Sequence, residues 1–222
     1  MAYDLHTHST LSDGTFAPIE MIRQAVANKT RAIAITDHAT SADMERIIPE
    51  IVRVCELARN YWEIVAIPGV ELTHEPARKV AETAARTKAM GAWIVVVHGE
   101  TIVEPVEKGT NLAAIKSADV DILAHPGLLS LDEAYLAAEK GKFLEISARK
   151  GHCLTNGHVA VLSKIAGFKL VVDSDAHKDV ELLTDSFADA VAHGSGLDNA
   201  ACLLAISTNP EALVKQILDR KK

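Results

Sequence analysis

Histidines and carboxylates recur along this chain at the ends of short apolar runs. His6 and His8 end the first run, and because side chains alternate along a strand, both imidazoles point to the same side. Residues of the same types follow later apolar runs: Asp37 and His38, Glu71, His98, His125, Asp173, Asp175 and His177. A core hydrogen bond explains any one histidine, but the repetition predicts a shared metal site.

Seven apolar runs rich in Val, Ile or Ala are predicted to be the strands that position these residues: 3–6, 32–36, 64–71, 93–98, 120–124, 143–147 and 169–173. Amphipathic stretches between them predict helices over 18–28, 41–60, 77–90, 112–117, 131–140, 156–166 and 180–193. A last helix is expected to begin with Asn209 as its cap and Pro210 as its first residue.

Strict alternation of strands and helices predicts a parallel sheet with crossover helices. Neither a Gly-x-Gly-x-x-Gly nor a P-loop pattern follows any strand, which argues against an open nucleotide-binding sheet. Seven strands in 222 residues favour an irregular seven-stranded barrel, an α/β fold in one domain over residues 1–222. In such a barrel the strands' C-terminal ends converge on one face, where active sites are built.

Composition restricts the partners of the protein. The formal net charge is −7, and Lys and Arg are scattered, which argues against a surface that binds nucleic acid. No apolar run approaches the roughly 20 residues that span a bilayer, so we expect no membrane contact and a cytoplasmic location. The sequence does not determine the oligomeric state.

The motifs, taken as a set, resemble those of the PHP superfamily, named for polymerase and histidinol phosphatase. They follow the family order from one end of the chain to the other: His6-Thr7-His8 with Ser12-Asp13-Gly14, Ile35-Thr36-Asp37-His38, Pro68-Gly69-Val70-Glu71, Val97-His98-Gly99, Ala124-His125-Pro126-Gly127 and Asp173-Ser174-Asp175-Ala176-His177. The resemblance implies a distorted (β/α)7 TIM-like barrel. It also implies phosphoester hydrolysis at a cluster of up to three ions of zinc, manganese or iron.

Transferred by motif position, the resemblance implies three sets of metal ligands. They are His6 and His8 with Glu71 and Asp175, then Glu71 as a bridge to His98 and His125, and finally Asp13 with His38 and His177. Many family members have a histidine in place of Asp13. A carboxylate there tilts that set towards manganese or iron.

Such a cluster suits the hydrolysis of a small phosphomonoester, resembling histidinol phosphate or a nucleotide. Metal ions neutralise the phosphate charge and activate a hydroxide, so no residue nucleophile is required. Arg149, Lys150 and His152 follow the sixth strand on the same face and are candidate substrate contacts. Asp37 is a candidate for orienting an imidazole. The roles of Glu145, Asp173, His74 and the 99–110 loop stay open.

Three other functions remain compatible with the residues. PHP domains also occur with DNA polymerases, so an exonuclease-like phosphodiesterase is one, and a non-catalytic metal-binding module is another. An amidohydrolase also begins with His-x-His on its first strand. It normally bridges its metals with a carboxylated Lys or a Glu, and here no Lys closes a middle strand whereas Glu71 closes the third.

Overall fold

Seven parallel strands form the wall of a barrel in the computed structural model, which describes residues 2–221. Their order is β1 (Tyr3–Asp4), β2 (Ala32–Ile35), β4 (Val65–Leu72), β5 (Ile94–His98), β6 (Ile122–Ala124), β7 (Phe143–Ser147) and β8 (Lys169–Asp173). The segments after β8 and β1 lie side by side, because Thr7 bridges Ala176 and the His8 N–H donates to the Ala176 carbonyl at 2.8 Å. The expected distorted (β/α)7 barrel is confirmed.

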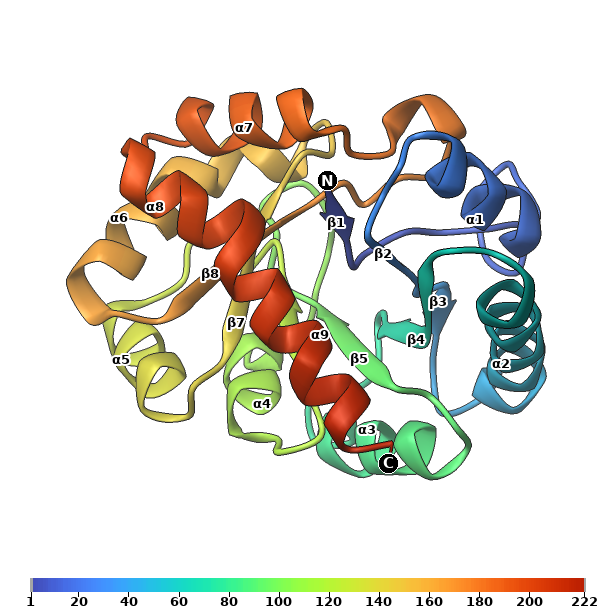
Figure 1. Cartoon of the computed structure of the whole chain (residues 1–222). Coiled ribbons are helices and arrows are strands. Elements are labelled where there is room, and N and C mark those ends of the chain that lie inside the picture. The colour runs from blue at the N-terminus through green and yellow to red at the C-terminus, as the bar shows by residue number, and fades with distance from the viewer. Residues whose placement is uncertain (1, 222) are drawn as a thin grey trace.

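The helices surround the barrel, with α9 across one open end (Figure 1). They are α1 (Pro18–Ala27), α2 (Met44–Tyr61), α3 (Val80–Ala89), α4 (Thr110–Lys116), α5 (Leu131–Glu139), α6 (Asn156–Ala166), α7 (Asp185–Gly194), α8 (Asn199–Leu203) and α9 (Asn209–Asp219). None of the helices among residues 2–221 is long and apolar enough to cross a membrane.

Two apolar cores hold the barrel together. The inner core fills the barrel with alternate strand residues such as Leu5, Ile67 and Ile94, and Leu213 and Ile217 of α9 close its base. The outer core lies between the strands and the surrounding helices. Because both strand faces are covered, the strands read as continuous apolar runs rather than alternating ones. The end opposite α9 is left for polar side chains.

The local structure differs from the sequence analysis in three places. A two-residue strand, β3 (His38–Ala39), was not anticipated, and it pairs with β4 so that His38 lies opposite Glu71. The predicted helix over 180–193 begins only at Asp185. Leu182 and Leu183 are instead buried, and the Leu183 N–H donates to Asp4 at 3.0 Å.

Asn209 does not cap the last helix. Its backbone is helical, with φ −69° and ψ −49°, and its side chain donates to the Leu170 carbonyl. The helical segment starts earlier, at α8, where Asp198 accepts from the Ala201 N–H. A π-helical stretch over Leu204–Thr208 joins α8 to α9. It lies just before Pro210, which has no N–H to continue a regular helix.

Candidate metal centre

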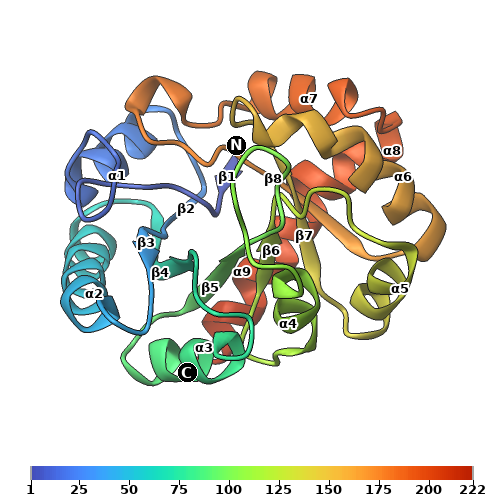
Figure 2. The ribbon, with the colours of Figure 1, turned by 180° about the vertical axis from the view of Figure 1, so that it is seen from behind.

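Histidine and carboxylate side chains from every strand of the wall except β2 meet at one end of the barrel. This end is opposite the one covered by α9, and in Figure 2 the helix α9 lies behind the strands. The first set comes from β1, β4 and β8. His6 Nε2 lies 3.0 Å from His8 Nε2 and 3.3 Å from Glu71 Oε1, and His8 Nε2 lies 3.2 Å from Asp175 Oδ1. His6, His8 and Glu71 are fully buried, so their ligand atoms are directed inwards.

A second set lies nearer the surface. Asp13 Oδ1 lies 3.1 Å from His177 Nε2 and 3.5 Å from His38 Nε2, while His38 Nδ1 lies 2.7 Å from Glu71 Oε2. Asp13 reaches these imidazoles because the 9–14 loop folds back tightly on itself. A Cβ at Gly14 would collide with the His8 carbonyl, so this turn requires glycine.

The third set comes from the ends of β4, β5 and β6. His98 Nδ1 lies 3.2 Å and His125 Nε2 3.3 Å from Glu71 Oε1. The ring of His152 stacks on that of His125, with centroids 4.0 Å apart. His152, expected to contact substrate, therefore also belongs to a ligand-competent set with His125 and Asp175, whose ligand atoms all lie within 4.8 Å of one another.

Unpaired imidazole nitrogens show that these residues fit metal ions. Among the described residues, His8 Nδ1 and His125 Nδ1 are buried without a partner, and the Nε2 atoms of His98 and His125 face carboxylate oxygens at 3.1 and 3.3 Å without forming a regular hydrogen bond. Buried polar atoms are normally satisfied, so an unpaired group indicates a missing partner such as an ion. Neutral imidazoles with carboxylates are a donor set for zinc, manganese or iron.

The charges around the centre favour a bound cation. Although burial opposes it, Glu71 and Glu145 raise the pKa of His6 well above its ordinary value, and Glu71 with Asp13 raises the pKa of His38 to about 10. Burial lowers the pKa of His8 to about 3, which keeps that imidazole neutral. Despite burial, His6, His98 and His38 hold the pKa of Glu71 well below its ordinary value. Glu71 is thus an ionised carboxylate among the imidazoles, and its negative charge favours a cation there.

Glu145 on β7 orients His6. The His6 Nδ1–H donates to Glu145 Oε2 at 2.6 Å, and neither side chain is exposed. A carboxylate on the far ring nitrogen fixes the tautomer that leaves Nε2 free for a metal. The neighbouring Asp173 accepts from the Leu5 N–H, and burial together with Glu145 raises its pKa well above the ordinary value.

The expected role of Asp37 does not agree with its contacts. Asp37 accepts hydrogen bonds from the backbone and hydroxyl groups of Ser9 and Ser12, at 2.6 to 3.0 Å, and from no imidazole among residues 2–221. It therefore fixes the loop that carries Asp13. The sequence placed Asp37 beside His38 but gave no sign that its carboxylate turns towards the 9–12 segment.

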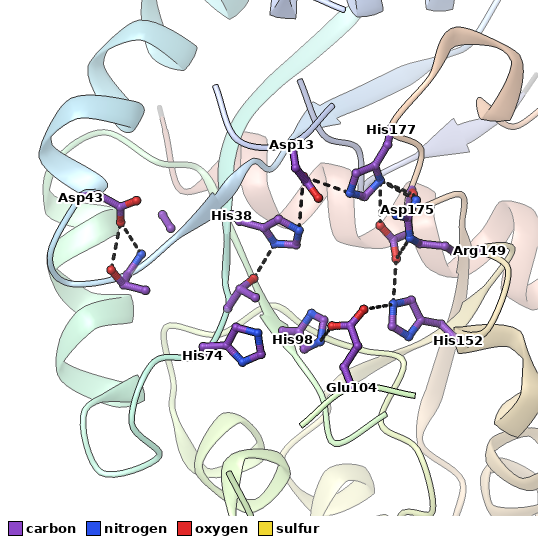
Figure 3. Close-up of a pocket in the computed structure, with 13 residues that line it drawn as sticks. Asp13, His38, Asp43, His74, His98, Glu104, Arg149, His152, Asp175 and His177 are labelled. Carbon is purple, nitrogen blue, oxygen red and sulfur yellow. Dashed lines mark hydrogen bonds and ion pairs between the residues drawn. The ribbon is translucent and has the colours of Figure 1, made fainter. Parts of the chain in front are cut away.

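A pocket of about 400 Å³ opens above these residues (Figure 3). Arg149 lines it and donates from Nη1 to the Asp175 carbonyl at 3.2 Å and to His177 Nδ1 at 2.7 Å. Lys150 does not line this pocket but an adjoining one. The sequence left the roles of His74 and Asp173 open. In the structure their positions differ, because His74 lines the pocket and Asp173 lies buried beneath it.

Glu104 was missed by the sequence analysis. It projects from the 99–110 loop between two imidazoles, 3.1 Å from His98 Nε2 and 3.5 Å from His152 Nε2 (Figure 3). The loop's length marked it as a candidate pocket wall. The sequence of the loop does not distinguish its acidic residues from one another. In the fold Glu100 accepts from the Gly109 and Asn111 N–H groups, whereas Glu104 reaches the pocket.

Backbone strain is concentrated at this centre. His74, His125 and Asp175 have φ values of 56°, 24° and 52°, in the region that non-glycine residues seldom adopt. Such conformations cost on the order of 1–3 kcal/mol each and persist mainly at functional sites. Two of the three residues belong to the ligand sets described above.

The sequence pattern of the PHP domain matches residues 4–192. The uncharacterized protein MJ1295 of Methanocaldococcus jannaschii is 44% identical over 218 residues, 98% of this chain and all of that protein. A "Probable phosphatase" of Acetivibrio thermocellus is 26% identical over 201 residues, 81% of this chain and 80% of that one.

Among solved structures, histidinol phosphate phosphatase of Lactococcus lactis, complexed with zinc, L-histidinol and phosphate, superposes with a TM-score of 0.60 at 16% identity. The match covers 89% of this chain and 94% of that one. At this identity, the likeness shows a common fold.

Proposed function

The chain belongs to the PHP domain family, and from this premise we propose that it is a metal-dependent phosphatase that hydrolyses a small phosphomonoester. The observation that carries the proposal is that the nine predicted ligand residues, joined by His152, meet beneath and around one pocket, with unpaired buried imidazole nitrogens among them. The names of the relatives support the same chemistry: one is called a probable phosphatase, and the fold neighbour holds zinc, an alcohol and phosphate.

We assign up to three divalent ions, of zinc, manganese or iron, to the ligand sets implied by the motifs. In the structure the same residues fall into overlapping groups: His6, His8 and Asp175; His6, Glu71 and His125; His38, Glu71 and His98; and His8, Asp13, His38 and His177. Glu71 belongs to two groups and lies within 3.3 Å of His6, His98 and His125, which suits a bridging carboxylate.

Bound ions would neutralise the phosphate dianion and lower the pKa of an attacking water. The chain's own residues do the remaining work. Arg149, at the pocket edge, presents a guanidinium that suits phosphate oxygens. Glu145 holds His6 in one tautomer, and Asp37 holds the loop of Asp13. The pocket is about 400 Å³ in volume, which suits a small ester.

The test is phosphate release from small monoesters by purified protein loaded with zinc, manganese or iron. The same screen includes bis-4-nitrophenyl phosphate, because preferential cleavage of this diester would instead show an exonuclease-like phosphodiesterase. His8→Ala removes a buried ligand, so we expect reduced metal content and turnover lowered at least about a hundredfold, with the fold retained. His193→Ala, at an exposed histidine on α7, is the control. Full metal content and normal activity in His8→Ala would refute the proposed centre.

A further inference from the structure

A second pocket adjoins the metal pocket, and Arg149 and Asp175 line both of them. This side pocket has a volume of about 380 Å³ and is otherwise lined by Ala148, Lys150, Ser174, Val180, Glu181 and Phe187. Volumes of this order are typical of small-molecule sites. A phosphate held at the metal centre would therefore have a hollow beside it for the group to which it is esterified.

The side pocket exposes apolar side chains that the fold does not use. Phe187 is 42% exposed and Val180 is 83% exposed, and both line this one cavity. A single exposed apolar residue needs no explanation. An aromatic and an aliphatic side chain lining one cavity beside a catalytic centre form a surface on which a planar ring can pack.

The walls of the side pocket are held in place before any ligand binds. Thr184 accepts from the Phe187 N–H at 3.2 Å, which fixes the first turn of α7 beneath the ring. Glu181 accepts from the His177 and Lys178 N–H groups at 2.8 and 3.1 Å. A preformed cavity binds a ring with little loss of conformational entropy.

Lys150 gives the side pocket a free cation. Its side chain is exposed, and within the part of the chain that the structure describes it forms no hydrogen bond or ion pair. Its ammonium group is thus available to a ligand, whereas Glu181 Oε2 accepts from two backbone N–H groups. The pocket combines an aromatic face with a positive charge at its edge.

We propose that the side pocket binds the alcohol part of the substrate and selects alcohols that carry a planar aromatic ring with an anionic or hydrogen-bond-accepting substituent. The inference rests on the proposed phosphomonoesterase function. The phosphate lies in the metal pocket, the ring packs on Phe187, and the substituent meets Lys150. Water adds to phosphorus, the phosphorus–ester oxygen bond breaks, and that oxygen leaves as the alcohol with a proton from the water.

The experiment compares two esters whose alcohols have similar intrinsic reactivity, 2-phenylethyl phosphate and n-butyl phosphate. The ratio of their kcat/KM values is measured for wild type, Phe187→Leu and Phe187→Ala. We expect the ratio to favour the ring in wild type and to fall about three- to tenfold in both variants, because an aromatic contact is lost. Tyr135→Leu is the matched control, since Tyr135 is an aromatic residue 51% exposed on α5. Lys150→Gln should weaken selection of 4-carboxyphenylethyl over phenylethyl phosphate about tenfold.

Binding of the non-hydrolysable 2-phenylethylphosphonate, measured by titration calorimetry, separates failure of this inference from failure of the proposed function. An unchanged ester ratio in the Phe187 variants, with both esters hydrolysed, would overturn the side pocket and leave the phosphatase intact. If wild type hydrolyses neither these esters nor any monoester of the earlier screen but binds the phosphonate more tightly than Phe187→Ala does, the phosphatase is refuted and the ring site is supported. Equal phosphonate binding by wild type and Phe187→Ala would overturn the ring site.

Discussion

Removing the carboxylate of Glu145 should weaken metal binding, and in Glu145→Gln it should change the stability of the protein little. Glu145 accepts from His6 Nδ1 at 2.6 Å, and both side chains are fully buried. A hydrogen bond to a charged group contributes about 1.5–3 kcal/mol, and a neutral acceptor keeps roughly half of that. We therefore expect about tenfold weaker metal binding in Glu145→Gln and about a hundredfold in Glu145→Ala, the range measured for outer-shell carboxylates.

Metal affinity is measured by calorimetric competition against a chelator, after removal of bound metal with EDTA. The free energy of unfolding of the same stripped samples is measured in urea. Glu145 raises the pKa of the neighbouring Asp173, so the neutral glutamine relieves a buried repulsion that offsets the weakened hydrogen bond to His6, and the stability of stripped Glu145→Gln should lie within about 1 kcal/mol of wild type.

Asp121→Asn is the matched control, because Asp121 is a buried carboxylate held by Lys88 and Arg220 and belongs to none of the ligand sets. It should lower stability and leave metal affinity unchanged. Wild-type metal affinity in both Glu145 variants would refute the argument that this carboxylate prepares His6 as a ligand.

Three further outcomes are expected. Arg149→Gln should raise KM for a monoester about 10- to 100-fold with a smaller loss in kcat. The KM of Arg149→Lys should lie between those of wild type and Arg149→Gln, because a single ammonium charge replaces the planar guanidinium. Equal KM values in wild type and Arg149→Gln would argue against phosphate binding by Arg149. Gly127→Ala should lower the free energy of unfolding in urea by more than about 2 kcal/mol, because φ is +67° and a Cβ would collide with the Glu100 carbonyl. Gly141→Ala, at φ +65° with no atom near, should lower it by only about 1 kcal/mol. Equal losses in the two variants would contradict this reasoning. Burial raises the pKa of Asp4 from 3.8 to about 6, so the folded state resists an ionisation that the unfolded chain undergoes. The free energy of unfolding of wild type relative to that of Asp4→Asn should therefore fall by about 3 kcal/mol between pH 3.8 and pH 6. A difference that does not change with pH would contradict this pKa shift.

The barrel was predictable because the strand segments combine an apolar run with a ligand-type residue at its end. His98 ends an apolar run, and His125 follows one directly, so the same segments identify the strands and the ligand-type residues. Asp13 was placed only through the family resemblance. It lies in a loop, and its approach to His38 depends on the turn at Gly14.

Side-chain direction in loops was not predictable. Asp37 adjoins His38 in sequence, yet its carboxylate accepts from Ser9 and Ser12, which lie 28 and 25 residues earlier. Glu145 was left open because orienting His6 requires that closure of the barrel bring β7 close to β1, with only β8 between them. Glu104 could not be separated from its acidic neighbours, since local sequence does not show which loop carboxylate reaches the pocket.

The start of α7 was misplaced for a related reason. The 180–193 segment has a helical pattern, but burial of Leu182 and Leu183 outweighs local helix propensity there. The two leucines hold an extended segment against the core, and Thr184 then caps the helix. The displaced start sets Phe187 in the first turn of α7, where it lines the side pocket.

The central claim is that the nine ligand-type residues hold metal ions that hydrolyse a phosphomonoester. It is tested most directly by stripping the protein with EDTA, returning zinc, manganese or iron in measured equivalents, and recording phosphate release from a monoester at each step. We expect no release from the stripped protein and a rise that saturates at up to three ions per chain. Full phosphate release by the stripped protein, or none at any metal loading, would contradict the account.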